Sequence, residues 1–300
     1  MSDLMDTLSI SRIFLPLRGY PAELRAANLA LILAEASGAL VHILNVKKIV
    51  DQHKYNFQVI RDLIIFQADK MKINVDVEIV EGISARNQIQ KKLEKERFDL
   101  IITGTQRSQG FPYDYRASNT LKLARSAERN CPLLVVQSKN ADFASNRIND
   151  REMEKILFPV VSGDKIDDLV ARIAKLLRNS MAATAAELLA IKVLGVSSFT
   201  APSFIKRDKA LLHTLSEDFL EQMNRYNAML KPFNLQILVG HKFDRAIVYL
   251  AKKEKIDLLL LGVRPPYTPL SLRTRPIWKI AKNARSDVVY VFGASESDAK

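Results

Sequence analysis

The 300-residue sequence contains a single cysteine, Cys131, and therefore cannot form an internal disulfide framework. One lone cysteine is typical of a protein from a reducing compartment, so we expect a cytoplasmic location. No apolar run approaches the roughly 18 residues that cross a membrane. The run Leu258–Val263 has only the length of a strand. The first residues are acidic and lack the basic-then-apolar pattern of a signal peptide, so none is predicted.

Aromatic residues are also scarce, at 7%, and no dense block of lysine and arginine occurs. The net charge is nevertheless +12, from 45 basic and 33 acidic residues. Such an excess can attract nucleic acid, anionic lipid or small anions. Because the basic residues are neither clustered nor interleaved with aromatics, a solvated basic surface is favoured over a specific nucleic-acid site.

Patterns that would indicate catalysis or metal binding are missing. The chain has four histidines, His42, His53, His213 and His241, and none has metal-ligand spacing. His42 falls in a predicted strand and is interpreted as a packed or hydrogen-bonded sheet residue. Cys131 precedes a proline and has no histidine nearby, which favours a buried structural thiol over a reactive one. No Ser-His-Asp or paired-carboxylate arrangement stands out, so we predict a protein that is not an enzyme and holds no metal.

Short apolar runs alternate with helix-length segments along the whole chain. Strands are predicted at 13–17, 40–46, 75–80, 100–103, 133–137, 156–160, 188–193, 235–239, 258–261 and 288–292. Helices are predicted at 21–37, 55–71, 82–97, 118–129, 166–178, a long segment ending near 230, 244–253 and 276–285. This alternation indicates an α/β fold with parallel sheets and right-handed crossovers. Two domains are expected, 1–140 and 151–296, with a polar linker over 138–151.

Two motifs occur once in each half of the sequence. Arg12–Leu17 returns as Lys155–Val160, and Phe98–Gly104 returns as Ile256–Gly262. In each motif a basic or acidic residue precedes a short apolar run that ends near Pro or Gly. This pattern is expected of a buried parallel strand that is followed by a loop. The chain is therefore predicted to contain one α/β unit twice.

These repeated strands, together with the turns at Gly82 and Gly240 and the closing segment Cys131–Val136, make the chain resemble a tandem universal stress protein over nearly its whole length. The resemblance implies two Rossmann-like domains, each with a five-stranded parallel sheet of order 3-2-1-4-5. Members of the family commonly dimerise through the fifth strand. The resemblance therefore implies that 133–137 and 288–292 pair within one chain as a pseudo-dimer, and further homodimer formation stays open.

In the nucleotide-binding members of that family, the fourth strand is followed by Gly, two residues, Gly, nine residues, and Gly-Ser or Gly-Thr. Glycines let the backbone approach phosphates, and the next helix supplies free N–H groups. The first half keeps Gly104 and, at the matching spacing, Ser118, but Arg107 replaces the second glycine. In the second half only Gly262 matches, with Pro265 and Arg275–Pro276 at the other positions.

Positions on the first two strands depart from the family pattern as well. Arg18 and Val161 stand where the binding branch has an aspartate that contacts the adenosine. A buried arginine offers only donors and cannot replace a carboxylate acceptor. The second strands end in Asn45–Val46 and Lys192–Val193, where the family often has His-Val. Both sites are therefore interpreted as degenerate, the second more completely.

Arginines near the carboxyl end of each sheet leave one alternative open. Arg18, Arg107 and Arg116 could converge on an anion, or they could be solvated loop residues. The same choice applies to a second set, Arg264, Arg273 and Arg275, with less weight because prolines stiffen that loop.

The resemblance implies a cytoplasmic, non-enzymatic stress-response module that senses a ligand or binds a partner, either a protein or an anionic small molecule. If ATP or AMP binds, the site is expected in the first domain. Its expected residues are Val46, Gly104 and Ser118, with Arg107 and Arg116 near the phosphates. Two alternatives remain open: an enzyme, either a weak ATP hydrolase or a kinase-like protein, and a regulatory partner of a membrane transporter or other membrane protein that recognises anionic surfaces.

Overall fold

The computed structural model describes residues 8–20, 23–47, 57–106, 131–138, 153–161, 164–180, 186–195, 217, 234–240, 242–264 and 276–293. In the first half the elements are β1 (Arg12–Leu17), α1 (Glu23–Ser37), β2 (Leu40–Lys47), α2 (Phe57–Met71), β3 (Val75–Glu81), α3 (Ala85–Lys95), β4 (Leu100–Gln106) and β5 (Leu133–Ser138). In the second half they are β6 (Lys155–Pro159), α5 (Lys165–Asn179), β7 (Glu187–Gly195), β8 (Asn234–Gly240), α8 (Phe243–Lys253), β9 (Leu258–Val263), α10 (Pro276–Asn283) and β10 (Asp287–Phe292).

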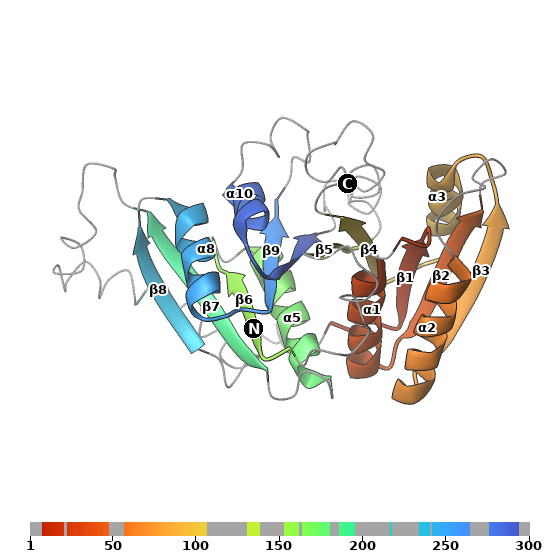
Figure 1. The fold of residues 1–300 in the computed structure, drawn as a ribbon, viewed down its shortest axis with the longest axis horizontal. Helices are drawn as coiled ribbons and strands as arrows, with labels where there is room; N and C mark the ends of the chain where they lie inside the picture. Colours follow the sequence, from red (N-terminus) through yellow and green to blue (C-terminus); the bar gives the residue numbers. More distant parts are fainter. Residues whose placement is uncertain are drawn as a thin grey trace, which may run out of the picture.

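These strands form one ten-stranded sheet of order β3-β2-β1-β4-β5-β10-β9-β6-β7-β8 (Figure 1). Within each half the neighbours are parallel and follow the order 3-2-1-4-5, which confirms the predicted fold class. The predicted helices at 118–129 and before 230 fall on residues outside the described part of the chain, apart from Glu217.

The two halves meet where β5 and β10 pair in antiparallel fashion, with Leu133 opposite Phe292 and Gln137 opposite Val288. The intrachain pairing implied by the resemblance is thereby confirmed. Across this seam the hydroxyl of Tyr290 donates a buried 2.8 Å hydrogen bond to Oε1 of Gln137. Because an exposed fifth strand would offer unpaired backbone groups, the pairing removes both edges at once.

Helices cover both faces of the sheet and create two cores. Apolar residues of α1, α2 and α5 pack on one face, and those of α3, α8 and α10 pack on the other. In α1, Ala26, Ala30 and Leu33 are fully buried, and so are Ala27 and Leu31. Since α1 contacts the sheet, α2 and α5 together, it is covered on several sides, as helices that are apolar all round are.

The aspartate repeated in the two motifs links strands that are distant in sequence. Oδ2 of Asp99 accepts hydrogen bonds from the backbone N–H of Ser11 (2.8 Å), the hydroxyl of Ser11 (2.7 Å) and the backbone N–H of Arg12 (3.0 Å). Asp257 does the same in the second half, accepting from the N–H groups of Glu154 and Lys155, both at 3.1 Å. Burial opposes ionisation of Asp99, but these donors outweigh it and lower the pKa. The repeated aspartate therefore holds the start of the fourth strand against the start of the first.

Cys131 and the start of the third helix can be compared with the sequence predictions. Cys131 is buried, and burial raises its pKa to about 12, which agrees with the predicted structural thiol. The third helix begins at Ala85 with Ser84 as its N-cap, not at Gly82 as predicted. Gly82 makes room for another contact, since a β-carbon there would lie 2.9 Å from Nε2 of Gln88. None of the described helices is long and apolar enough to cross a membrane.

We predict that Tyr290→Phe lowers the free energy of unfolding by about 1–3 kcal/mol, because the Gln137 amide then loses the hydroxyl that bonds its buried oxygen. Urea unfolding followed by circular dichroism measures the change. Tyr249→Phe, at an exposed tyrosine, is the matched control and should be neutral. Equal stabilities of the two variants would contradict the importance of this seam contact.

Candidate functional site

In each half, the first and fourth strands separate at their carboxyl ends. The β1–β4 ladder joins Ile13 to Leu100 and Phe14 to Ile101. By the same register Leu17 stands opposite Gly104, but these two residues lie past the end of the ladder and are not paired. In open α/β sheets, ligands bind at this reversal of strand order. We call the two places the first and the second crevice; the second lies between β6 and β9, whose ladder likewise ends early.

The structure places two of the predicted nucleotide residues near the first crevice. Gly104 lies on β4 and is paired with Val136 of β5. Val46, near the end of β2, is half-buried and packs against the core under α3. The other predicted residues, Arg107, Arg116 and Ser118, lie outside the part of the chain that is described. Arg18 is exposed, so the expectation of a buried arginine at the end of β1 was wrong.

A carboxylate of the chain itself occupies the loop that follows β1. Oε2 of Glu23, the first residue of α1, accepts from the consecutive backbone N–H groups of Arg18, Gly19 and Tyr20 at 2.8, 2.8 and 3.0 Å. Gly19 has a φ of 101°, which favours glycine and helps to turn the three donors toward one point. Successive N–H groups arranged in this way form a binding place for an anion. Here the acceptor is a side chain of the protein itself, so this loop does not serve an incoming ligand.

The buried position of Glu23 affects its protonation. Burial raises its pKa from 4.5 to about 7, against the opposing effect of the three N–H donors and of Arg18. Sequence reasoning missed this residue because a glutamate at the start of a helix is also an ordinary helix-favouring choice.

In the second crevice, Arg264 is held by two aspartates. Its Nε lies 2.6 Å from Oδ2 of Asp164, and its Nη2 lies 2.7 Å from Oδ1 of Asp167. Asp164 is also the N-cap of α5, and Asp167 is buried and accepts from the N–H of Val161 at 3.0 Å. The guanidinium thus joins the end of β9 to the start of α5 and crosses the crevice. The charge of Arg264 is thus matched within the protein, which does not favour the hypothesis that it helps to bind an anion.

Gly262, the one match to the nucleotide pattern in the second half, serves packing. A β-carbon at this position would lie only 2.6 Å from Cγ2 of Ile166 on α5. Ile166 therefore occupies the space above the strand that a larger residue would take. A glycine at the end of the fourth strand can be needed for helix packing as readily as for phosphate approach.

Asn45 and Lys192, which stand where the family often has histidine, bond the main chain at the end of the first strand of each half. Nδ2 of Asn45 donates to the carbonyl of Leu17 at 2.9 Å, and Nζ of Lys192 donates to the carbonyl of Val161 at 2.5 Å. Burial lowers the pKa of Lys192, while the nearby Asp167 partly restores it. These two side chains satisfy main-chain acceptors at equivalent places, which is a structural role.

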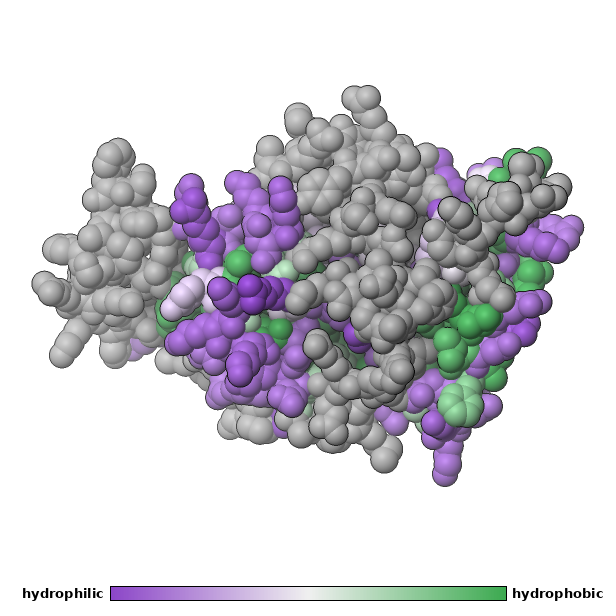
Figure 2. All heavy atoms as spheres, viewed as in Figure 1, coloured by the Kyte–Doolittle hydropathy of each residue, from purple (hydrophilic) through white to green (hydrophobic). Residues whose placement is uncertain are grey.

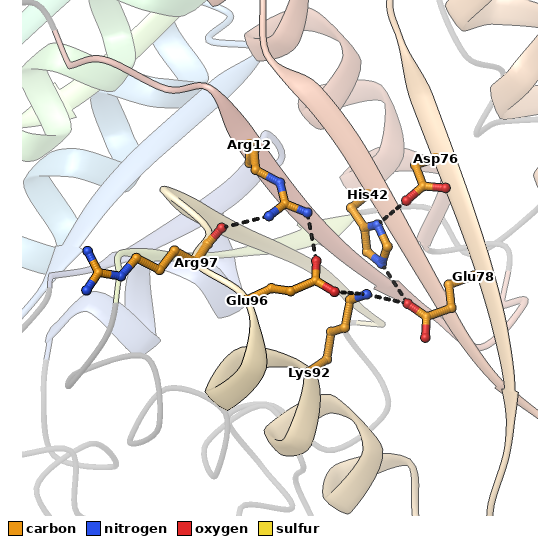
Figure 3. Close-up of polar contacts among 7 residues, drawn as sticks. All are labelled: Arg12, His42, Asp76, Glu78, Lys92, Glu96 and Arg97. Atoms are coloured by element: carbon orange, nitrogen blue, oxygen red, sulfur yellow. Dashed lines mark hydrogen bonds and ion pairs between the residues drawn. The ribbon is translucent and has the colours of Figure 1, made fainter.

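A second polar cluster, which the sequence did not predict, lies between α3 and the sheet (Figure 3). His42 is buried, with Nδ1 2.7 Å from Oδ2 of Asp76 and Nε2 3.2 Å from Oε2 of Glu78. The imidazole, on β2, thus links the side chains of two acidic residues of β3. His42 is confirmed as a hydrogen-bonded sheet residue.

The cluster continues as a chain of alternating charge. Lys92 lies 2.5 Å from both Glu78 and Glu96, and Arg12 lies 2.7 Å from Glu96 (Figure 3). Hydrogen bonds from Lys92 and then Arg12 lower the pKa of Glu96 to about 2. The sequence feature that could have indicated this cluster is the pair Asp76 and Glu78 on one face of a strand, followed by a helix with basic residues in its last turn. Because the cluster starts at the amino end of β1, it belongs to the scaffold and not to the crevice.

Solved structures share this architecture over almost the entire chain. A universal stress protein from Archaeoglobus fulgidus is 14% identical, with 98% of this chain and 99% of that chain covered and a TM-score of 0.58. The chain has the tandem universal stress protein fold. A candidate universal stress protein from Pseudomonas aeruginosa matches at 17% identity, 95% and 94% coverage, and a TM-score of 0.59.

A third structure that is similar in fold to this chain is the cytoplasmic domain of a prokaryotic cation chloride cotransporter. It is 14% identical, with 97% of this chain and 98% of that chain covered and a TM-score of 0.57. No family model and no curated protein matches the sequence. At these identities the likeness is one of fold.

We predict that Glu23 gives the stability of the protein a recognisable pH dependence. Between about pH 4.5 and 7 the folded state keeps a proton that the unfolded chain has lost, so the free energy of unfolding falls as pH rises. The fall is at most about 3 kcal/mol and levels off above the folded pKa. Glu23→Gln keeps an acceptor oxygen and removes the titration, so its stability should change less over this range.

Urea unfolding at pH 5, 6, 7 and 8 measures this difference. Asp62→Asn, at an exposed carboxylate on α2, is the control and should follow the unmodified protein. Parallel curves for Glu23→Gln and the unmodified protein would show that Glu23 does not titrate in the folded state.

Proposed function

We propose that this protein is a cytoplasmic, non-enzymatic tandem universal stress protein that binds a ligand or a partner as part of a stress response. The observation that carries the proposal is the charged bridge at the second crevice, where Arg264 is bound by Asp164 and Asp167. Only the first half then keeps features of a nucleotide site. Two side chains with catalytic potential in the described part of the chain support a non-enzymatic role, because Cys131 is a buried thiol with a raised pKa and His42 is bonded on both sides.

Within this proposal, ATP or AMP binds in the first half. Support comes from Gly104 at the first crevice and from the sequence position of Ser118, with Arg107 and Arg116 between the two in the sequence. Glu23 fills the anion-binding loop after β1, so the phosphates would have to rely on the segment after β4. That dependence makes Ser118 the informative position for a test.

Isothermal titration with ATP, ADP and AMP tests the assignment. We expect Ser118→Ala to weaken binding about tenfold, the loss of one hydrogen bond to a charged group. Arg275→Ala, at the equivalent part of the second half, should leave binding unchanged. Binding that survives Ser118→Ala but not Arg275→Ala would contradict the assignment to the first half. Steady ATP turnover that scales with protein and is lost in Ser118→Ala would contradict the non-enzymatic role.

A second candidate function is regulation of a membrane transporter. It is favoured by the likeness in fold to the cytoplasmic domain of a cotransporter, which extends over 97% of this chain. The positive charge of residues 151–300, which carry +8 of the total of +12, would suit a position beside an anionic membrane surface.

Sedimentation with vesicles of phosphatidylcholine and phosphatidylglycerol tests this candidate. We expect binding at about 0.05 M salt that is lost at about 0.3 M, because screening shortens the reach of exposed charges. Vesicles of phosphatidylcholine alone are the control. Absence of binding to the anionic vesicles at low salt would remove the membrane-surface role and leave the ligand-binding role unaffected.

A further inference from the structure

The outer edge of β3 presents main-chain groups that no described strand uses. β3 ends the sheet on the side of the first half. The N–H of Val41 donates to the carbonyl of Asn74 at 3.0 Å, and the N–H of Gly82 donates to the carbonyl of Lys47 at 3.1 Å. The main-chain N–H and C=O groups of the even-numbered residues of β3 therefore point toward β2. The N–H and C=O groups of Val75, Val77, Ile79 and Glu81 therefore point to the outside.

The face of β3 under α2 continues into an exposed apolar surface. Val75 and Val77 pack against the core, whereas Ile79 on the same face is 51% exposed. Three apolar residues of α2 at i, i+4 and i+7 are also exposed: Val59, Leu63 and Phe66. Figure 2 shows apolar side chains gathered over α2 and β3 at this end of the molecule. We call this surface, with the outward backbone of β3, the β3 edge.

The opposite face of β3 is acidic. Asp76 and Glu78 each use one oxygen for the cluster with His42 and Lys92 and turn the other away from it (Figure 3). The Asp76 side chain remains 58% exposed. At the other end of the sheet, β8 (Asn234–Gly240) contains no acidic residue, so the two outer edges differ in charge.

We propose that the β3 edge binds an extended segment of a partner protein in which apolar and basic residues alternate. Such a segment would add a strand beside β3 through main-chain hydrogen bonds. Because side chains alternate between faces, its apolar residues would cover Ile79 and the exposed flank of α2, and its basic residues would stand opposite Asp76 and Glu78. Two β3 strands paired antiparallel would bring their acidic rows together, which disfavours a second copy as the occupant.

The proposal deepens the partner-binding role, and its test can be separated from the nucleotide titration. The probe is a fluorescein-labelled peptide of about eight residues that alternates lysine with valine, titrated with the full chain by fluorescence anisotropy. We expect saturable binding, and at least about tenfold weaker binding when glutamate replaces lysine. A glutamate peptide that binds equally well would overturn the proposal.

Two N-methylated peptides test whether the main chain is used. Methylation of every valine N–H blocks the groups that face β3 in an antiparallel strand, and methylation of every lysine N–H blocks those of a parallel strand. We expect one of the two peptides to lose binding and the other to keep it, which also gives the strand direction. Equal affinities of the two methylated peptides would overturn strand addition.

A matched pair of variants locates the site. Ile79 stands opposite Asn45 on β2, and Ile237 stands opposite the equivalent Lys192 on β7, so the two isoleucines occupy the same place on the two outer edges. Ile79→Thr should weaken peptide binding about fivefold or more, and Ile237→Thr less than about twofold. Equal effects would overturn the location, with thermal unfolding as the check that both variants fold.

Self-association of the protein and a negative nucleotide titration would each bear on the proposal in a different way. A dimer that forms with rising protein concentration and is lost in Ile79→Thr would show that a second copy occupies the edge, and would overturn the proposed partner. If the nucleotide titration is negative while the peptide binds, the proposed nucleotide site fails and the β3 edge stands, because the two share no residue.

Discussion

The antiparallel pairing of β5 with β10 is the constraint on which the rest of the structure depends. It joins two similar half-sheets into one, with the buried hydrogen bond from Tyr290 to Gln137 across the seam. The seam also brings α1 beside α5, and both helices bury most of their apolar residues. The same pairing leaves β3 and β8 as the two outer edges, so it also decides where another chain can add a strand.

The two crevices show how one scaffold can change its chemistry without changing its strands. In the first half an internal carboxylate, Glu23, takes the N–H donors of the loop after β1. In the second half Arg264, Asp164 and Asp167 form a charged bridge across the corresponding place. Both arrangements satisfy buried polar groups that a ligand could otherwise satisfy, and buried charge is costly unless it is matched in this way. The halves therefore differ in what they leave accessible at the carboxyl end of the sheet.

Much of the fold could be predicted because its signals are local and repeated. The period of the apolar residues places the ends of every described strand within three residues, and the resemblance carried by the repeated motifs implies the strand order and the seam. The burial of Cys131 and the bonded state of His42 followed from their neighbours in sequence. The sites were harder to predict, since Gly262 matched a phosphate pattern yet is required by the packing of Ile166, and Arg18 is exposed. A motif gives the residue type at a position but not the side chain that approaches it from another element.

The sequence by itself determined the class of fold, the two copies of one unit and the strand that joins them, because hydrophobic periodicity and turn residues act over a few neighbouring positions. Only the tertiary structure decided which charges meet: Arg264 with Asp164 and Asp167, Lys92 with Glu78 and Glu96, and Asp99 with the start of β1. Coulombic and hydrogen-bond energies depend on separation and burial, and for elements far apart along the chain both are set by how helices and strands pack.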